Sequence, residues 1–373
     1  MKYYLIAGEA SGDLHGSNLI RAIKKSDPEA EFRFFGGDLM KERGGTLVCH
    51  YEKLAFMGIF DVLANIRTIL GNLAFCKKDI LEFSPDALIL IDYPGFNLRI
   101  ARFAKKRGLK IYYYISPKVW AWKKSRIPKL KEYIDRIFVI FPFEVEFFRL
   151  HGIDVEYYGN PLKDAISLYK SSKTAGDKLQ ANDMDKRPVI ALLCGSRKHE
   201  VQRCLPEMLK AAESFPDFRF IVAGVSSVDE MVYTSILNGT ETGLVKNSTY
   251  ALLDKSFAAI VTSGTATLET LLFKVPQVVV YKTGFLTYNM ARLFIKIRFF
   301  SLVNIIAGKE VVKELLQVRL AERIRSELKK IVMDDTYRSN MINEYNKIER
   351  MIGEEGVSEK VGKSIVQLTE NRL

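Results

Sequence analysis

Cysteine and histidine are scarce in this sequence, and neither is spaced for a disulfide framework or a metal. The four cysteines are scattered through 373 residues without a CxxC pair, which suits a reducing cytoplasm better than a disulfide scaffold. The four histidines show neither HxxxH nor HExxH spacing, so a dedicated metal site has little support. We therefore expect no metal and no other cofactor.

Long hydrophobic runs are also missing. The apolar run at 1–7 is too short for a signal peptide, and no stretch approaches the ~20 residues that span a bilayer. We expect a soluble or peripheral protein. The net charge of +12 and the pI near 9.3 predict an anionic partner, for which nucleic acid, lipid headgroups and phosphorylated substrates all qualify. Nucleic acid is disfavoured because the basic residues are spread along the chain rather than clustered beside stacking aromatics.

Apolar runs separated by helical periods divide the chain into two similar halves. In the first half, runs with little alternation predict strands buried on both faces at Tyr3–Ala7, Asp86–Ile91, Ile111–Ile115 and Ile137–Phe141. A polar stretch at 169–188 is interpreted as a linker. Strands are then expected at Val189–Leu193, Phe218–Ala223, Ala258–Thr262 and Gln277–Tyr281, and a helical, strandless region from about Glu310. This alternation predicts an α/β protein with two Rossmann-like domains.

The loops that follow these strands are the candidate sites, because ligands of open α/β sheets bind beyond the carboxyl ends of the strands. The first loop, Gly8–Asp13, has small residues that let a ligand approach the backbone, and it leads into a helix start that favours anions. It is not a GxGxxG fingerprint, and a structural tight turn explains it equally well.

Two further loops of the first half carry chemistry. Asp92 directly follows a predicted strand, where a carboxylate suits a general base; capping of the next helix or a salt bridge is the alternative. The loop Ser116–Trp122 contains both tryptophans of the chain, Trp120 and Trp122. They would wall a sugar or acyl pocket, or pack against the core as tryptophan more commonly does.

In the second half, two loops are suited to phosphate. Gly195–Glu200 combines backbone N–H groups, a helix start and the Arg197 fork, which together suit a diphosphate; a basic, solvated turn is the alternative. Ser263–Glu269 opens another helix whose first N–H groups would meet phosphate. Glu269 lies four residues beyond Thr265, on the same helical face, and would bind a ribose diol or form a structural pair with Thr265.

Two segments are apolar enough to contact lipid. Tyr288–Phe300 mixes basic and apolar residues, and Leu54–Phe60 is a second apolar stretch. A surface helix of such composition lies on anionic lipid, whereas an amphipathic core helix is the alternative.

In this order and number, the motifs resemble those of the lipid-A-disaccharide synthases. They run nearly the whole length of the chain, at Gly8–Asp13, Phe56–Gly58, Asp92–Asn97, Ser116–Trp122, Pro142–Glu144, Gly195–Arg197 with Glu200, Ser263–Glu269, Tyr281–Lys282, Asn304 and Lys313–Gln317.

The resemblance implies the GT-B architecture, with two Rossmann-like domains facing across a cleft. The implied N-terminal domain, on the acceptor and membrane side, covers 1–168, with helices at about 340–373 packing back on it. The implied UDP-sugar-binding domain covers 187–339. The implied reaction moves 2,3-diacylglucosamine from UDP to the 6-hydroxyl of 2,3-diacylglucosamine 1-phosphate (lipid X), with inversion to a β-1,6 linkage.

Residue roles follow from the resemblance by position. Asp92 resembles the base that takes the proton of the acceptor hydroxyl. The residues implied for nucleotide and donor binding are Gly195, Ser196, Arg197, Ser263, Gly264, Thr265, Glu269, Asn304 and Gln317. Those implied for the acceptor and the cleft are Glu9, Ser11, Gly12, Asn97 and Trp120.

Three positions depart from the family pattern. Cys194 and Val303 stand where proline is usual, and Asn160 stands where histidine is common. They leave the detailed contacts at Gly195 and Asn304 open, but none removes a charge that the mechanism needs.

The partners implied are acylated UDP-glucosamine, lipid X and an anionic phospholipid surface, with the protein on the cytoplasmic face of a bacterial inner membrane. A homodimer and the acyl-chain length are left open. The alternatives are another GT-B UDP-sugar transferase or epimerase, and a basic binding module without catalysis.

Overall fold

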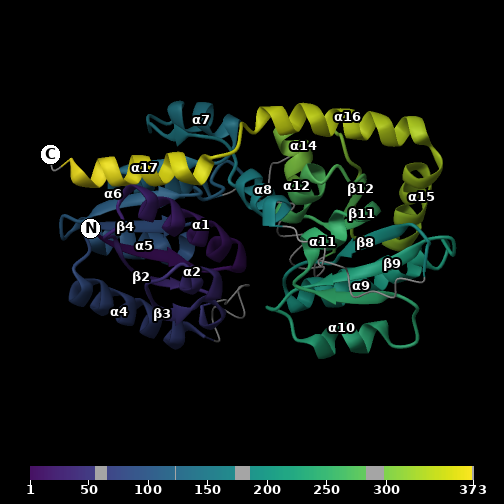
Figure 1. Ribbon diagram of the computed structural model, residues 1–373, viewed down its shortest axis with the longest axis horizontal. Helices are drawn as coiled ribbons and strands as arrows, with labels where there is room; N and C mark the ends of the chain where they lie inside the picture. The colour runs from purple at the N-terminus through teal and green to yellow at the C-terminus, as the bar shows by residue number, and fades with distance from the viewer. Residues whose placement is uncertain (55–64, 122, 173–184, 283–297, 372–373) are drawn as a thin grey trace. The chain divides into compact units, whose positions relative to one another are not determined.

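The computed structural model describes residues 1–54, 65–121, 123–172, 185–282 and 298–371 (Figure 1). The chain forms two compact units: unit 1 is Met1–Ala165 with Ile352–Leu373, and unit 2 is Ile166–Met351. Each unit is a parallel sheet covered by helices, as the apolar runs predict.

Unit 1 has a seven-stranded sheet in the order β3-β2-β1-β4-β5-β6-β7, and every pairing is parallel. The strands are β1 (Lys2–Ala7), β2 (Glu31–Gly36), β3 (Thr46–His50), β4 (Ala87–Ile91), β5 (Lys110–Tyr114), β6 (Arg136–Val139) and β7 (Glu156–Tyr157). The order reverses between β1 and β4, so the chain leaves these two strands in opposite directions along the sheet.

Both faces of this sheet are covered, which explains why its strands lack alternation. One face packs on α4 (Ile66–Phe83), α5 (Pro94–Lys105), α6 (Ile127–Tyr133) and α7 (Pro142–Arg149). The other packs on α1 (Ala10–Ser26), α2 (Asp38–Glu42) and α17 (Val357–Glu370). Along β1, Tyr4 and Ile6 face the first layer while Tyr3 and Leu5 face the second, and all four are fully buried.

The last helix is held in unit 1 by a carboxylate and a close helix contact. Asp164, on α8 (Leu162–Ser172), accepts N–H groups of Gly356 and Ser358 at 2.7 Å each, at the start of α17. Gly362 of α17 lies so near α1 that a Cβ there would meet Ala22 at 2.8 Å. Residues 352–373 therefore belong to unit 1, whereas α16 (Asp335–Met351) belongs to unit 2.

Unit 2 has a six-stranded parallel sheet in the order β10-β9-β8-β11-β12-β13. Its strands are β8 (Val189–Leu193), β9 (Arg219–Gly224), β10 (Gly243–Lys246), β11 (Ser256–Thr262), β12 (Gln277–Tyr281) and β13 (Glu314–Leu316). Its further helices are α9 (Lys198–Ala212), α10 (Glu230–Leu237), α11 (Thr249–Leu253), α12 (Thr265–Leu272), α14 (Leu302–Ala307) and α15 (Leu320–Met333).

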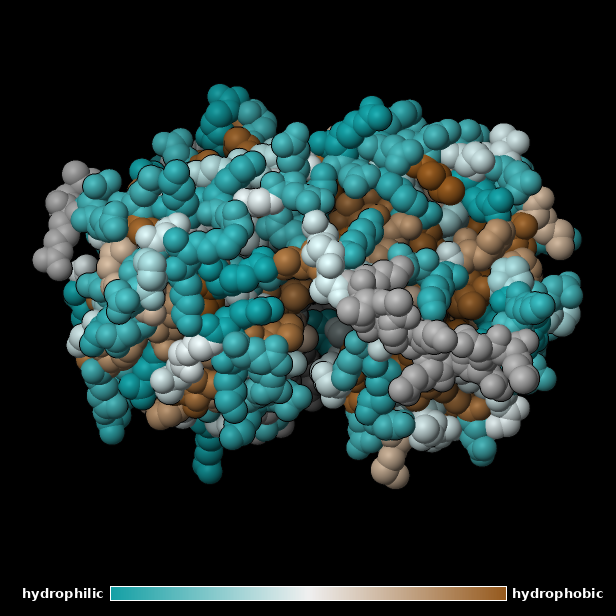
Figure 2. Space-filling view, in the orientation of Figure 1, coloured by the Kyte–Doolittle hydropathy of each residue, from teal (hydrophilic) through white to brown (hydrophobic). Residues whose placement is uncertain are grey.

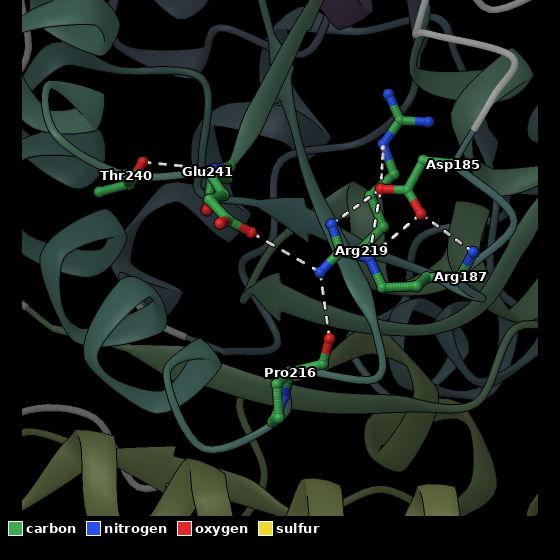
Figure 3. Close-up of polar contacts among 7 residues, drawn as sticks. Asp185, Arg187, Pro216, Arg219, Thr240 and Glu241 are labelled. Carbon is green, nitrogen blue, oxygen red and sulfur yellow. Dashed lines mark hydrogen bonds and ion pairs between the residues drawn. The ribbon is translucent and has the colours of Figure 1, made fainter.

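An ion-pair network anchors the chain just before β8, the first strand of unit 2 (Figure 3). Arg187 donates to Asp185 at 2.8 Å and to the carbonyl of Pro216 at 3.0 Å, and it lies 3.6 Å from Glu241. The Arg187 guanidinium holds the pKa of Asp185 near 2. This network sits at the amino ends of β8 and β9, away from the edge where ligands are expected.

Three expectations need correction. The region after about Glu310 contains a strand, β13, which was missed because three residues at the edge of a sheet leave little pattern. The start of the presumed linker, Tyr169–Ser172, is helical and belongs to α8. Helix α1 begins at Ala10, so most of the predicted loop after β1 is its first turn.

Hydrophilic side chains make up most of the face drawn in Figure 2, with hydrophobic areas between them. Such a mixture is ordinary for a globular protein, since much of any folded surface is apolar. Within the described residues, the helices lack the combination of length and apolar content needed to cross a membrane.

Candidate active site

The reversal of strand order marks one point in each sheet where a ligand can enter between diverging loops. In unit 1 this point lies between β1 and β4, and in unit 2 between β8 and β11. The predicted loops with Glu9 and Asp92 follow the first pair, and those with Arg197 and Ser263 follow the second.

The backbone at Asp92 is strained and firmly held. Asp92 and Tyr93 have φ of 42° and 47°, in the left-handed region that costs non-glycine residues about 1–3 kcal/mol each. The Asp92 carbonyl accepts hydrogen bonds from the Tyr113 hydroxyl and from the Asn97 amide, the latter at 2.7 Å. Strain maintained by buried hydrogen bonds is typical of functional positions.

Capping of the next helix is not the role of Asp92. Helix α5 begins after Tyr93, and no side chain caps it. No ion pair of Asp92 occurs within 4.0 Å among the described residues. Asn97 is fully buried, and its side-chain amide also donates to the carbonyl of Ile6 at 3.4 Å. It therefore links the end of β1 to the residue that follows β4. Contact of Asn97 with an acceptor stays a prediction.

The pKa of Asp92 is raised to about 6, chiefly by burial and also by the negative charge of Glu9. The positive charges of Lys118 and Arg126 act in the opposite direction. The carboxyl is thus a stronger base than an ordinary aspartate, yet it is largely ionised at neutral pH. This balance suits a group that must accept a proton.

The loop after β1 brings the backbone close to this carboxylate. Glu9 precedes the first residue of α1, and Ser11 and Gly12 lie in its first turn. A Cβ at Gly8 would stand 2.3 Å from the ring of Tyr93, so only glycine permits this approach. The backbone between β1 and α1 therefore lies against Tyr93, one of the two strained residues after β4.

The loop after β5 is tied to α7 by a buried carboxylate. Glu144 accepts hydrogen bonds from the Ser116 hydroxyl at 2.8 Å and the Trp120 indole N–H at 3.1 Å. Its other oxygen accepts the backbone N–H groups of Ile140 and Phe141. Sequence reasoning assigned no role to Glu144, although it stands in one of the matching motifs.

Trp120 is half-buried, with its ring edge against Phe143 at a centroid distance of 5.0 Å. Its position is therefore fixed by a hydrogen bond at one end and ring packing along its side. Trp122 lies outside the described residues. A sugar or acyl contact of Trp120 remains a prediction.

In unit 2, Glu200 organises the loop after β8. It accepts the backbone N–H of Ser196 at 3.0 Å and the guanidinium of Arg197 at 3.0 Å. Gly195 has φ of 107°, and a Cβ there would meet Glu200 at 2.5 Å. The loop thus holds a partly exposed Arg197 at the start of α9, as an anion site requires.

The loop after β11 leads directly into α12. Ser263 donates to the carbonyl of Phe300 at 2.8 Å, and Gly264 is the N-cap, without a capping side chain. The first N–H groups of α12, from Thr265 onward, are therefore not capped by their own loop. Anions are favoured at such a helix start.

Glu269 lies one turn into α12 and accepts a hydrogen bond from the Tyr250 hydroxyl at 3.0 Å. Burial raises its pKa, and the bond from Tyr250 opposes that effect. Its structural partner is thus Tyr250, which the sequence gave no reason to single out, rather than Thr265.

Asn304 is fully buried, and both polar atoms of its side-chain amide form hydrogen bonds within the protein. Its Nδ2 donates to the Val312 carbonyl and to Glu314, and its Oδ1 accepts the N–H groups of Val311 and Val312. It therefore shapes the chain that leads into β13. Gln317 follows β13 with φ of 54°. Nucleotide contacts of Asn304 and Gln317 stay predictions.

The described residues contain no cluster of three or more His, Cys, Asp or Glu side chains that could hold a metal ion.

Replacing Asp92 by asparagine should stabilise the protein above pH 6. Because the folded state holds the Asp92 proton up to about pH 6 and the unfolded chain releases it near 3.8, ionisation in this window lowers stability. At pH 7.5 we expect the free energy of unfolding of the Asp92→Asn protein to exceed that of the wild type by at most about 3 kcal/mol, at 1.4 kcal/mol per pKa unit. Its Tm should be higher accordingly. The gain should fade as the pH falls to 4.

Calorimetry or circular dichroism at several pH values tests this, with the exposed Asp217→Asn as the matched control. A variant that gains nothing at pH 7.5 relative to pH 4 would contradict the raised pKa.

Comparisons with known proteins match the whole chain. A family model described as lipid-A-disaccharide synthetase covers residues 3–367. The lipid-A-disaccharide synthase of Syntrophus aciditrophicus is 38% identical over 365 residues, which is 95% of this chain and 94% of that protein. That of Geobacter metallireducens is 36% identical over 372 residues, with 98% and 96% covered.

Solved structures share the fold at low identity. A UDP-GlcNAc 2-epimerase from Neisseria meningitidis bound to UDP-GlcNAc matches with a TM-score of 0.67 and 14% identity, over 98% of this chain and 100% of that one. A calicheamicin glycosyltransferase matches with a TM-score of 0.57 and 14% identity, over 100% and 98%. These likenesses confirm the predicted GT-B fold.

The full-length match to the family model and identities above 30% over nearly the whole chain decide the family, as the motifs predict. The chain belongs to the lipid-A-disaccharide synthases, a family of glycosyltransferases.

Proposed function

We propose that this protein transfers 2,3-diacylglucosamine from its UDP derivative to the 6-hydroxyl of 2,3-diacylglucosamine 1-phosphate. The products are the β-1,6-linked disaccharide 1-phosphate and UDP. Family membership supports the reaction, and the observation that carries the mechanism is the half-buried Asp92, whose pKa burial raises to about 6.

The proposed chemistry is a single displacement with one base. The acceptor O6 attacks the anomeric carbon of the donor from the face opposite UDP, and the bond from that carbon to the β-phosphate oxygen of UDP breaks, so the configuration inverts. Asp92 takes the proton of the attacking hydroxyl, which makes O6 a better nucleophile as the bond forms. The step is faster when the base is already in position, and the hydrogen bonds to the Asp92 carbonyl hold that residue in place.

The departing diphosphate would be bound by unit 2. Arg197 offers a planar fork of donors, and the Gly195–Ser196 backbone lies beside it. The N–H groups at the start of α12, after Ser263 and Gly264, add a second positive potential. Such fixed donors stabilise the charge that develops on UDP as it leaves.

Glu269 is proposed to accept hydrogen bonds from the ribose hydroxyls of UDP. Tyr250 holds the carboxylate in place, leaving the second carboxylate oxygen for a ligand. Asn304 and Gln317 are proposed to lie near the nucleotide. In unit 1, Glu9, Ser11, Gly12, Asn97 and Trp120 are proposed to line the acceptor side.

A different UDP-sugar transferase or a UDP-sugar epimerase is the nearest alternative, because solved epimerases share the fold. Purified protein with both diacylated substrates should form a disaccharide phosphate and UDP, and it should prefer the diacylated donor over UDP-N-acetylglucosamine. The Asp92→Ala variant should form no product while it still binds UDP, because only the base is removed.

Mass spectrometry of the products, with UDP binding measured by calorimetry, tests this. Preference for the non-acylated donor would refute the function, and near-normal turnover by Asp92→Ala would exclude Asp92 as the base.

Loss of the Arg197 side chain should weaken UDP binding. The Arg197→Ala change should cost roughly 1.5–3 kcal/mol, the range for a hydrogen bond to a charged group. The control is Arg203→Ala, which removes the same charge from an exposed position on the same helix. Equal UDP affinity of the two variants in calorimetry would contradict the proposed role of Arg197.

We further propose that the protein works at the cytoplasmic surface of the inner membrane. Ile66 and Leu70 of α4 are 48% and 57% exposed, and Leu81, three turns further on the same face, is 49% exposed. Arg67 is also exposed, in the first turn of the same helix. Apolar side chains beside basic ones on an exposed helix face suit the surface of an anionic bilayer.

The protein should therefore bind anionic phospholipid vesicles at low salt and lose that binding at high salt. Replacement of Ile66 and Leu70 by glutamate should abolish sedimentation with the vesicles. The matched control is Leu150→Glu, at a 71% exposed leucine in the same unit but outside α4. The absence of sedimentation by the wild type at low salt would count against membrane association.

A further inference from the structure

Basic residues follow the strand next to the proposed base. Strand β5 pairs in parallel with β4, with Tyr114 opposite Ile91, so the loop after β5 emerges beside Asp92. This loop carries Lys118 and Arg126. Apart from their effect on the pKa of Asp92, the mechanism proposed above gives these cations no task.

Hydrogen bonds fix the conformation of the first part of this loop. Ile115, where it begins, has φ of 64°, which is strained for a β-branched residue. Hydrogen bonds to the buried Glu144 fix Ser116 and Trp120, on either side of Lys118. Farther on, Lys123 has φ of 56° and its carbonyl accepts the N–H of Arg126 at 3.0 Å. Lys118 therefore stands on a backbone that is fixed on both sides, and Arg126 ends a short 3-10 turn, η2 (Lys124–Arg126).

The positive charges of Lys118 and Arg126 both act on Asp92. Lys118 and Arg126 each lower the pKa of Asp92, and the charge of Arg126 also lowers that of the Tyr113 hydroxyl, which donates to the Asp92 carbonyl. Within the described part of the chain, Lys118 forms no ion pair with a carboxylate. Arg126 also lowers the pKa of Lys123, so like charges have been brought together here.

The substrates offer one anion suited to this place. In the acceptor, the phosphate on C1 and the hydroxymethyl group on C5 flank the ring oxygen. A phosphate site must therefore lie about one sugar ring away from the base that receives the 6-hydroxyl proton. Lys118 lies four residues beyond Tyr114, which pairs with Ile91 next to Asp92, and Arg126 is close enough for its charge to act on Asp92, so both cations stand near the proposed base.

We propose that Lys118 and Arg126 bind the anomeric phosphate of the acceptor and thereby direct its 6-hydroxyl to Asp92. The inference rests on the proposed function, which supplies the phosphorylated acceptor. Arginine gives phosphate a two-pronged contact, and lysine adds a point charge. The phosphate also offsets the repulsion among the cations, so an acceptor without it binds poorly.

The test compares two acceptors that differ only in the phosphate. The kcat/KM for 2,3-diacylglucosamine 1-phosphate and for 2,3-diacylglucosamine is measured in neutral detergent micelles, which removes lipid charge from the comparison. The variants are Lys118→Ala and Arg126→Ala. The control is Lys124→Ala, which removes a charge from the same loop, where the ammonium lies over the ring of Phe147 at 5.8 Å.

The wild type and the control should prefer the phosphorylated acceptor. Each variant should lose ten- to a hundredfold in kcat/KM for it, the effect expected for a charged hydrogen bond, and under threefold for the other acceptor. The KM for the donor should not change. Equal losses on both acceptors would mean that the cations act only through Asp92, and unchanged preference would show no phosphate contact; either result overturns the inference.

A wild type without product from either acceptor would contradict the proposed function instead. In that event, equilibrium dialysis of the phosphorylated acceptor in the same micelles still decides the phosphate site. A tenfold weaker affinity of both variants, but not of Lys124→Ala, supports it, and equal affinities overturn it.

Discussion

Parallel pairing of the strands sends all their carboxyl ends to one edge of each sheet, and the reversal of strand order opens a single gap at that edge. Every proposed chemical group depends on this constraint. In unit 1 it brings Glu9 and Asp92 together from β1 and β4, and in unit 2 it does the same for the loops after β8 and β11. The Asp185–Arg187 network lies at the opposite, amino ends of the strands, where it ties the chain before β8 to its neighbours.

Within unit 1, the proposed chemistry depends on the opposing effects of burial and of nearby charges on the pKa of Asp92. Burial makes the Asp92 carboxylate costly to ionise and raises its pKa, while Lys118 and Arg126 keep the ionised form accessible. A carboxyl balanced in this way takes a proton readily and is regenerated at neutral pH. The strained backbone at Asp92 is sustained by the Tyr113 and Asn97 hydrogen bonds, so the proposed base is placed before a substrate binds.

The sequence predicted the strands that are buried on both faces, because their apolar runs are continuous. Val189–Leu193 and Gln277–Tyr281 match β8 and β12 residue for residue. Strand β2 was missed because charged residues interrupt it, and the structure neutralises one of them by pairing Arg33 with Asp79 at 2.6 Å. The strand-end loops could be predicted from position, but the residues that hold them could not. Glu144 lies 28 residues from Ser116, and such contacts leave no local pattern.

The central claim is that a carboxyl with a raised pKa accepts the acceptor proton. The pH dependence of kcat/KM for the acceptor without phosphate measures it most directly, because the 1-phosphate itself titrates near pH ~6; with this acceptor the acid limb reports the base of the free enzyme. The account predicts that the rate falls below an apparent pKa of about 6, as burial sets it for Asp92. A rate that holds constant down to about pH 4.5, where an ordinary exposed carboxylate would still be ionised, would contradict it.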